Sequence, residues 1–436
     1  MMIPSAKTKD LVAPANFNMT YDTIIGLEIH AELKTKSKMF CSCDNDAEGK
    51  APNTNVCPVC LAHPGTLPAP NKQAIDWTIL TGLALHCKIN HVSKFDRKNY
   101  FYPDLPKGYQ LSQYDQPFCY DGWLEVEGEK VLITRIHLEE DTGKSVHMTN
   151  PDRTLLDFNR AGTPLMELVT EPTIKDAAQA KKFGQLYQQI LRYLNISDAD
   201  MEKGQMRCEA NISVQEQGAW EYKDGLILAT KKNHPLNAKV EVKNINSFRA
   251  MERAINFEVH RQTALLEKNE KIAAETRGWD ENKSQTVSQR IKETAADYRY
   301  FPEPDIPPFR IDDTLLAKLQ AELPELPNEK KMRFIREYGL QDKITASAGQ
   351  KILEKMYSDG GDPTDIMIEM GLEQMDNTAE METIVKKIIA DNAPQVEQYH
   401  AGKTSVFQFF VGQVMAATRG KANPKTVKEL LEKFLK

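Results

Sequence analysis

Long apolar runs are absent from this sequence. Its 436 residues contain no stretch of about 18 consecutive apolar residues, so no transmembrane helix is predicted. Residues 1–18 lack the apolar core of a signal peptide, and residues 1–20 are interpreted as a loose polar extension without an assigned function. We therefore expect no association with a membrane.

Cysteine and excess charge are also scarce. Seven cysteines, an odd number in a long chain, argue against a disulfide framework and indicate a cytoplasmic protein. The net charge of −6 excludes a uniformly basic coat for nucleic acid, although it allows one basic patch. The length favours two or three globular domains.

A phosphate-binding P-loop is missing as well. Thr142-Gly143-Lys144-Ser145 resembles the end of such a loop, which requires a glycine at position 138, where the chain has Leu138. If the protein uses ATP, we expect it to bind the nucleotide on an open sheet with metal ions.

Turn residues and hydrophobic periodicity predict an α+β protein. The first part of the chain, about 300 residues, has short alternating runs typical of strands, with two longer amphipathic helices at 173–195 and 247–270. Prolines at 302–308 and 324–327 interrupt this pattern. An all-α region is predicted after them, with helices at 329–338, 347–358, 378–391, 404–418 and 424–435.

Four predicted strands each have one strongly polar face. Side chains alternate along a strand, so residues two apart share a face. The four faces carry Glu28, His30 and Glu32; Arg135, His137 and Glu139; Arg207, Glu209, Asn211 and Ser213; and Lys239, Glu241 and Lys243. A solvated surface is one interpretation of each strand alone. If the strands share a sheet, the pattern equally suits a site for Mg²⁺ and a polyphosphate.

Four cysteines form two close pairs. Cys41 and Cys43 are followed, after 13 residues, by Cys57 and Cys60. This spacing predicts a structural zinc site with four thiolate ligands. Four reduced thiols, or a redox pair at Cys57 and Cys60, are the alternatives. The other three cysteines are isolated and are interpreted as core residues.

Several long motifs resemble the family of B subunits of aspartyl/glutamyl-tRNA amidotransferases. The clearest is Asp157-Phe158-Asn159-Arg160-Ala161-Gly162-Thr163-Pro164-Leu165-Met166-Glu167. The others lie at 26–33, 94–104, 108–113, 138–144, 244–248, 297–305, 410–415 and 420–424. Together the motifs cover roughly residues 21–330 and 345–436, in the family's order.

The resemblance implies a fold and a set of domains. It implies an antiparallel-sheet cradle related to glutamine synthetase, with a helical region and a small helical tail domain after it. We expect the cradle with its zinc knuckle at 21–310, a shortened helical linker at 311–345 and the tail domain at 346–436. Family members carry several dozen more residues between the segments that correspond to 338–340 and 346–348, and residues 220–235 form a longer insertion than usual.

The resemblance also implies an activity and partners. ATP and Mg²⁺ would activate the carboxylate of Glu-tRNA(Gln), of Asp-tRNA(Asn) or of both, and ammonia would then form the amide. In the implied heterotrimer, the A subunit is an amidase that would release the ammonia, and a small C subunit would accompany it. We find no amidase nucleophile in this chain.

Individual residues take roles from the same resemblance. Glu28, His30 and Glu139 match the family's metal-binding positions, and Glu209 is a further candidate. Lys98 and Glu140 match residues that line the ammonia path, although a solvated loop cation is the alternative for Lys98. From their sheet face, we expect Arg207 and Lys243 to neutralise phosphate charge.

The C-terminal residues suggest a contact with tRNA. Residues 401–436 carry a local charge of +5 in a chain with a negative total. A solvated helix face is the alternative to a phosphate contact. The candidate tRNA-binding residues are Arg419, Lys421, Lys425 and Lys428.

Two other classes of function compete with this hypothesis. A non-catalytic tRNA-binding scaffold with the same fold need not keep the carboxylate and histidine residues, yet all of them are present. A ligase for free amino acids would not need a basic C-terminal appendage.

Overall fold

The computed structural model describes residues 21–149, 152–231, 235–291, 297–338, 346–372, 378–400, 406–418 and 421–435. The chain divides into two compact units between Leu326 and Pro327, at the second proline signal. The predicted domain limits at 310 and 345 stay predictions. Arg419 lies outside the described residues.

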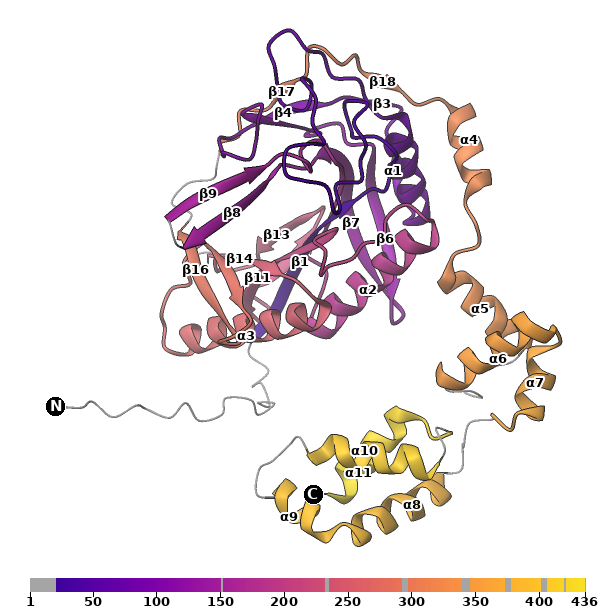
Figure 1. Ribbon diagram of the computed structural model, residues 1–436. Coiled ribbons are helices and arrows are strands. Elements are labelled where there is room, and N and C mark those ends of the chain that lie inside the picture. The colour runs from indigo at the N-terminus through magenta and orange to yellow at the C-terminus, as the bar shows by residue number, and fades with distance from the viewer. Residues whose placement is uncertain are drawn as a thin grey trace. The chain divides into compact units, whose positions relative to one another are not determined.

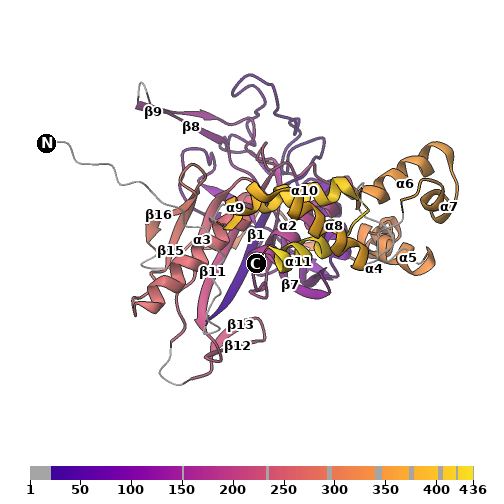
Figure 2. The ribbon, with the colours of Figure 1, turned by 90° about the horizontal axis from the view of Figure 1, so that it is seen from below.

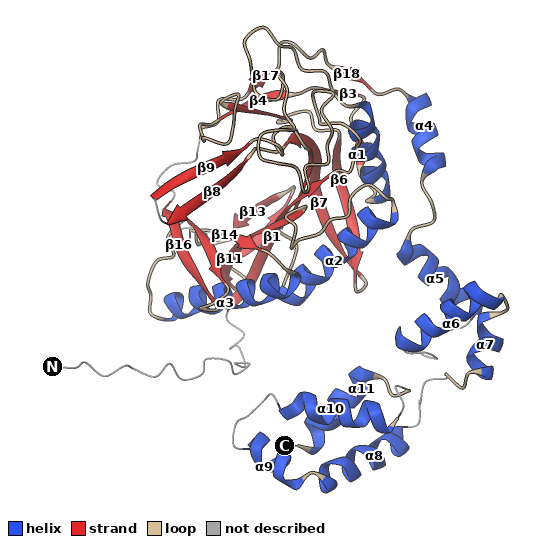
Figure 3. Ribbon diagram, viewed as in Figure 1, coloured by secondary structure: helices blue, strands red, loops and turns tan. Residues whose placement is uncertain are grey.

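One large sheet dominates the first unit (Figures 1 and 3). All neighbouring strands run antiparallel except β14 and β15, which are parallel. The order is β16 (Gln285–Ile291), β15 (Glu275–Asp280), β14 (Val240–Ile245), β11 (Met206–Glu216), β1 (Tyr21–Glu32), β10 (Pro164–Thr170), β7 (Glu129–Glu140), β6 (Cys119–Val126) and β2 (Lys88–Ile89).

Short strands surround this sheet. β4 (Asp96–Asn99) lies between β5 (Tyr109–Ser112) and β17 (Phe301–Pro302), and β3 (Val92–Ser93) pairs with β18 (Phe309–Arg310). Two hairpins consist of β8 (Lys144–Thr149) with β9 (Asp152–Asp157) and β12 (Trp220–Lys223) with β13 (Leu226–Ala229).

Helices α2 (Ala177–Tyr193) and α3 (Phe248–Glu267) lie along one face of the large sheet (Figure 3). Asp176 and Ser247 cap their N-termini by accepting hydrogen bonds from backbone N–H groups, which explains where both helices begin. Phe183, Tyr187 and Leu191 recur every four residues on α2, so they share one stripe. Both helices confirm the sequence-based prediction.

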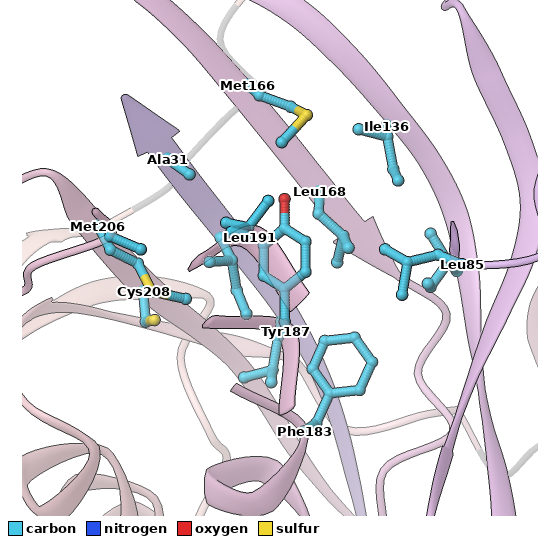
Figure 4. Packing of buried hydrophobic residues seen from close by; sticks show 14 of the residues in the cluster. Ala31, Leu85, Ile136, Met166, Leu168, Phe183, Tyr187, Leu191, Met206 and Cys208 are labelled. Atoms are coloured by element: carbon cyan, nitrogen blue, oxygen red, sulfur yellow. The ribbon is translucent and has the colours of Figure 1, made fainter. Parts of the chain in front are cut away.

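The stripe of α2 packs against the apolar side chains of the central strands (Figure 4). Phe183, Tyr187 and Leu191 are completely buried. In Figure 4 they lie among residues of β1, β7, β10 and β11, namely Ala31, Ile136, Met166, Leu168, Met206 and Cys208. This face therefore forms the core, and the alternating polar side chains are left on the opposite face.

Helices α1 (Lys72–Ala84) and α4 (Asp313–Glu322) complete the first unit, and the sequence analysis missed both. Most side chains of α1 are buried, because the helix packs against β6, β7, α2 and α4. A helix buried on several sides lacks the one-sided apolar period that identifies a surface helix.

The second unit is helical, which confirms the predicted fold class. Its helices are α5 (Pro327–Tyr338), α6 (Ala346–Asp359), α7 (Pro363–Glu369), α8 (Thr378–Asp391), α9 (Ala393–His400), α10 (Val406–Ala417) and α11 (Pro424–Phe434). Helices α6 and α7 share one small core, and α8, α10 and α11 share another. The short α7 and α9 were not predicted from the sequence. No described helix is long and apolar enough to cross a membrane.

Candidate active site

The register of the sheet brings the predicted polar faces together. His30 of β1 lies opposite Arg207 of β11 on one side and opposite Glu167 of β10 on the other. Glu167 in turn lies opposite His137 of β7. Directly opposed residues of antiparallel strands project to the same face. The four strands share one sheet, which was the condition for a common polar face, and β10 is an additional strand between β1 and β7.

A carboxylate–histidine cluster occupies the centre of this face. His30 Nε2 lies 3.3 Å from Glu167 Oε2 and 3.8 Å from Glu139 Oε1. His137 Nε2 lies 3.1 Å from the same Glu167 oxygen and 3.6 Å from Glu139 Oε2. Ser112 donates a hydrogen bond of 3.0 Å to Glu139. One ligand atom each of His30, Glu139 and Glu167 lies within 4.8 Å of the other two.

The electrostatics of this cluster favour a cation. Burial by itself lowers the pKa of His30, but Glu167 and then Glu139 raise it to about 9. For Glu167, burial by itself raises the pKa, but the adjacent His137 and His30 hold the pKa well below its ordinary value. The two carboxylates therefore remain ionised and attract positive charge.

A second acidic cluster lies further along β1. Glu28 directs an oxygen toward Glu209 of β11 and Glu241 of β14. Lys243 Nζ lies 2.7 Å from Glu209 and 3.2 Å from Glu241, and Asn211 donates a hydrogen bond of 2.8 Å to Glu28. The predicted metal position Glu28 thus belongs to a different cluster from His30 and Glu139. Glu28 and His30 are two residues apart on one strand, so roughly 7 Å separates their positions.

Arg207 is held by an aspartate next to these clusters. Arg207 Nη2 lies 2.8 Å from Asp141 Oδ2, and Arg160 Nε lies 3.5 Å from the same oxygen. Burial and then Asp141 raise the pKa of the neighbouring Glu32 to about 8. Arg207 keeps about a third of its side chain exposed, so its guanidinium remains accessible from the open face.

The two candidates for the ammonia path have different surroundings. Lys98 lies on β4, and its ammonium is 5.4 Å from the centre of the Tyr298 ring. Burial lowers the pKa of Lys98, but Glu139 and other nearby groups raise it above its ordinary value. Glu140 instead forms an ion pair of 2.5 Å with Lys107 and accepts a hydrogen bond from Leu111 N. These surroundings favour a role for Lys98 at the site over a solvated loop cation.

A cavity of about 350 Å³ adjoins Glu28. Its walls include Ile24 and Leu27 of β1, Val169 of β10 and Ile227 of β13. Its volume and largely apolar walls, with a few polar groups, are those of a small-molecule site. The hairpin β12–β13 that supplies Ile227 lies beyond the end of β11 (Figure 2). It falls within residues 220–235, the segment that the resemblance predicts to be longer than usual.

The four predicted cysteine ligands also converge. Their sulfur atoms all lie within 4.8 Å of one another, and Cys57 Sγ and Cys60 Sγ are 3.8 Å apart. Tetrahedral zinc with bonds of about 2.3 Å requires sulfur separations of roughly 3.8 Å, so the donor set fits zinc. A hydrogen bond from Cys41, together with nearby groups that include Lys38, lowers the pKa of Cys60 to about 4. The other cysteines, Cys87, Cys119 and Cys208, are buried, as predicted.

Sequence reasoning assigned no site role to Glu167, Asp141 or Arg160. Glu167 is a single carboxylate in the apolar run Pro164-Leu165-Met166-Glu167-Leu168-Val169, which is the signal that could have identified it. A charged residue within a buried strand requires partners, and those partners come from the neighbouring strands. Asp141 and Arg160 lie in the motifs of the resemblance but not in an alternating pattern.

The first unit thus carries acidic residues and histidines on the polar face of a mostly antiparallel sheet. The sequence model described as GatB/GatE catalytic domain matches residues 23–317, and the one described as GatB domain matches residues 315–435. The chain therefore belongs to the GatB/GatE family.

Proteins similar to this chain are named as the B subunit of aspartyl/glutamyl-tRNA(Asn/Gln) amidotransferase. The one from Roseiflexus sp. (strain RS-1) is 41% identical over 495 aligned positions, which cover 96% of this chain and 99% of the relative. The one from Thermotoga maritima is 41% identical over 493 positions, with the same coverage. Both alignments are longer than the 436 residues of the chain, so the relatives contain residues that this chain lacks.

Proposed function

We propose that this chain is the subunit of a tRNA-dependent amidotransferase that activates the misacylated tRNA. A side-chain carboxylate oxygen of Glu-tRNA(Gln), of Asp-tRNA(Asn) or of both attacks the γ-phosphorus of ATP and releases ADP. Ammonia then attacks the carbonyl carbon of the acyl phosphate and displaces phosphate. The protein is thus a carbon–nitrogen ligase.

The observation that supports this proposal is the convergence of two acidic clusters on one open sheet face. Phosphoryl transfer depends mainly on positioning and charge neutralisation, and it needs no protein nucleophile. Mg²⁺ bound by Glu139, Glu167 and His30, and by Glu28 with Glu209, would supply positive charge to the phosphates. The oxygen-rich donor set fits such an ion.

The chain's own cations complete the site. Arg207 and Lys243 border the two clusters. Their positive charges can neutralise the negative charge that develops on the phosphates. Arg135 Nε is buried and lacks a hydrogen-bond partner among the described residues, which leaves a donor for an anionic ligand. The cavity beside Glu28 would hold the nucleoside of ATP, with Ile24 and Ile227 against the base.

The remaining assignments form part of the same proposal. Cys41, Cys43, Cys57 and Cys60 hold structural zinc, and the large sheet is the cradle related to glutamine synthetase. Lys98 and Glu140 line the path of ammonia from the amidase, the A subunit of the heterotrimer, which the small C subunit accompanies. The complex works in the cytoplasm, and the seven free thiols are in keeping with this compartment.

The test is amidation by the complex of this chain with its amidase partner. Glu28→Gln should abolish ATP cleavage that depends on Glu-tRNA(Gln), while glutaminase activity of the partner persists. Glu125→Gln, an exposed carboxylate on β6, is the matched control and should leave the rate unchanged. Wild-type amidation by Glu28→Gln would refute the assignment of this face.

Two results would favour the competing functions. ATP-independent binding of tRNA without amidation in the assembled complex would indicate a scaffold. Amidation of free glutamate at rates similar to those with Glu-tRNA(Gln) would indicate a ligase for free amino acids.

A further inference from the structure

Lys38 is a lysine in the interior of the protein. Its side chain is completely buried, and it is among the largest fully buried side chains of the chain. It lies between the first strand and the cysteine pairs, and its stem packs against Gly162. An ammonium group is almost never fully buried unless another group compensates its charge.

The ammonium of Lys38 has few partners. It donates a hydrogen bond of 2.9 Å to the carbonyl oxygen of Asn55, and it lies 3.9 Å from Cys60 Sγ. Among the residues that the structure describes, no carboxylate forms an ion pair with it. A neutral carbonyl cannot balance a buried charge, so the negative charge must come from the cysteine cluster.

The charge of a metal-bound cluster meets this need. Four thiolates around one divalent ion carry a net charge of −2, and this charge is costly without a nearby cation where a ligand is buried, as Cys60 is. One ammonium beside Cys60 offsets half of that charge. We propose that Lys38 is the built-in counter-cation of a divalent metal ion held by Cys41, Cys43, Cys57 and Cys60.

This inference rests on the proposed zinc site and gives Lys38 a role as a positioning residue. The backbone of two neighbouring residues also connects this region to the turn before β10. Asn55, which accepts the ammonium hydrogen bond, donates its own N–H to Asn159 Oδ1 at 2.8 Å. Met39 N donates to the Gly162 carbonyl at 2.7 Å. These hydrogen bonds connect the surroundings of the cysteine cluster to the segment before β10, the strand that carries Glu167.

The experiment measures metal affinity in the full chain by competition between the protein and a chromophoric chelator, with Zn²⁺ and Co²⁺ as probes. Lys38→Met should weaken binding by about 10- to 100-fold, the effect typical of groups that support metal ligands. Lys36→Met, an exposed lysine two residues earlier, is the matched control and should bind as the wild type does. If Lys38→Met does not fold, Lys38→Gln keeps a donor for Asn55 and removes only the charge.

A second variant separates charge from packing. Cys60→His replaces a thiolate by a neutral imidazole, which reduces the net charge of the cluster to −1. Lys38→Met should then cost clearly less affinity in this background than in the wild type. An equal loss in both backgrounds would overturn the inference, because it would show that Lys38 acts by packing alone.

The remaining outcomes distinguish the inference from the proposals on which it rests. Zinc bound equally tightly by Lys38→Met, Lys38→Gln and the wild type would overturn the role of Lys38 and leave the zinc site intact. A wild-type chain that amidates tRNA without binding metal at the cysteines would overturn both the zinc site and the role of Lys38, and it would leave the enzymatic proposal standing.

Discussion

Glu167 lies between the two histidines of the carboxylate–histidine cluster. One of its oxygens lies between His30 and His137, at 3.3 Å and 3.1 Å. Both histidines are largely buried, and the charge of Glu167, followed by Glu139, raises the pKa of both. A carboxylate in this position can hold either the imidazoles or a divalent ion, and the two compete for the same lone pairs.

The Glu167→Gln variant tests this residue. Removing the charge should lower the rate of ATP-dependent amidation by about 10- to 100-fold and raise the Mg²⁺ concentration needed for half-maximal rate. A titration of the assembled complex with Mg²⁺ measures both effects. Unchanged activity and metal dependence would contradict a role for Glu167 in cation binding, and Glu125→Gln again serves as the control.

At the scale of elements, the hairpin β12–β13 extends the site beyond the sheet. Trp220 Nε1 donates a hydrogen bond of 2.9 Å to Asp22 Oδ2, which anchors the hairpin to β1. Ile227 then lines the cavity next to Glu28, while the neighbouring Leu228 points to the other side and is 38% exposed. The hairpin β12–β13 thus contributes a wall to the proposed nucleoside cavity.

We expect Ile227→Ser to raise KM for ATP by roughly tenfold, because full burial of an isoleucine contributes about 1.5–3 kcal/mol and Ile227 is partly buried. The value of kcat should change little, since Ile227 lies away from the phosphates in the proposed arrangement. Initial rates at varied ATP concentration measure the effect. Leu228→Ser is the control, and an equal change in both variants would argue against the cavity as the nucleoside site.

Helix α3 is joined to β15 and β16 by a buried ionic network. Glu258 is fully buried and lies 2.6 Å from Arg261 Nη2 and 3.5 Å from Arg277 Nε. Thr286 Oγ1 donates a further hydrogen bond of 2.9 Å to it. The network links the helical layer to β15 and β16 at one edge of the sheet, and β15 pairs with β14, which carries Glu241.

Glu258→Gln should destabilise the first unit by about 1–3 kcal/mol, because it removes one fully buried carboxylate from two arginines that keep Glu275 as their other partner. Denaturant unfolding followed by tryptophan fluorescence measures the change. Glu267→Gln, an exposed carboxylate on the same helix, should have almost no effect. If the two variants had equal free energies of unfolding, the charges of the two arginines would already be compensated by solvent or by other groups.

At the scale of the whole molecule, the second unit is a candidate for binding tRNA. Lys421 and Lys428 retain exposed surface, and Lys425 lies in α11. Lys433 instead forms an ion pair of 2.9 Å with Glu382 of α8. A deletion from Thr404 onward would remove α10 and α11, whose side chains form most of the core that they share with α8. Point variants therefore test the contact with tRNA more cleanly than a deletion does.

The double variant Lys421→Ala with Lys428→Ala should raise KM for Glu-tRNA(Gln) and make it less dependent on salt. Each lost phosphate contact reduces the slope of log affinity against log salt by about 0.7–0.9. Lys433→Ala is the control, since that ammonium is already paired. Binding of the double variant that equals the wild type at physiological salt would contradict a tRNA contact here.

The sequence alone determined a large part of this protein. Alternation of polar and apolar residues along β1, β7, β11 and β14 identified the polar face, because a strand has only two faces. Helical periodicity located α2, α3 and most helices of the second unit. The spacing of Cys41, Cys43, Cys57 and Cys60 indicated a metal site, since ligands so close in sequence need little help from the rest of the fold.

Only the tertiary structure decided how these parts combine. The order of the strands placed β10 between β1 and β7, which brought Glu167 to His30 and assigned Glu28 to another cluster. The tertiary structure also placed the buried Lys38 beside Cys60, and it placed Ile227 at the cavity next to Glu28. In each case the residues brought together are far apart in the sequence. Strand order and burial depend on long-range packing, and no local pattern of residues encodes them.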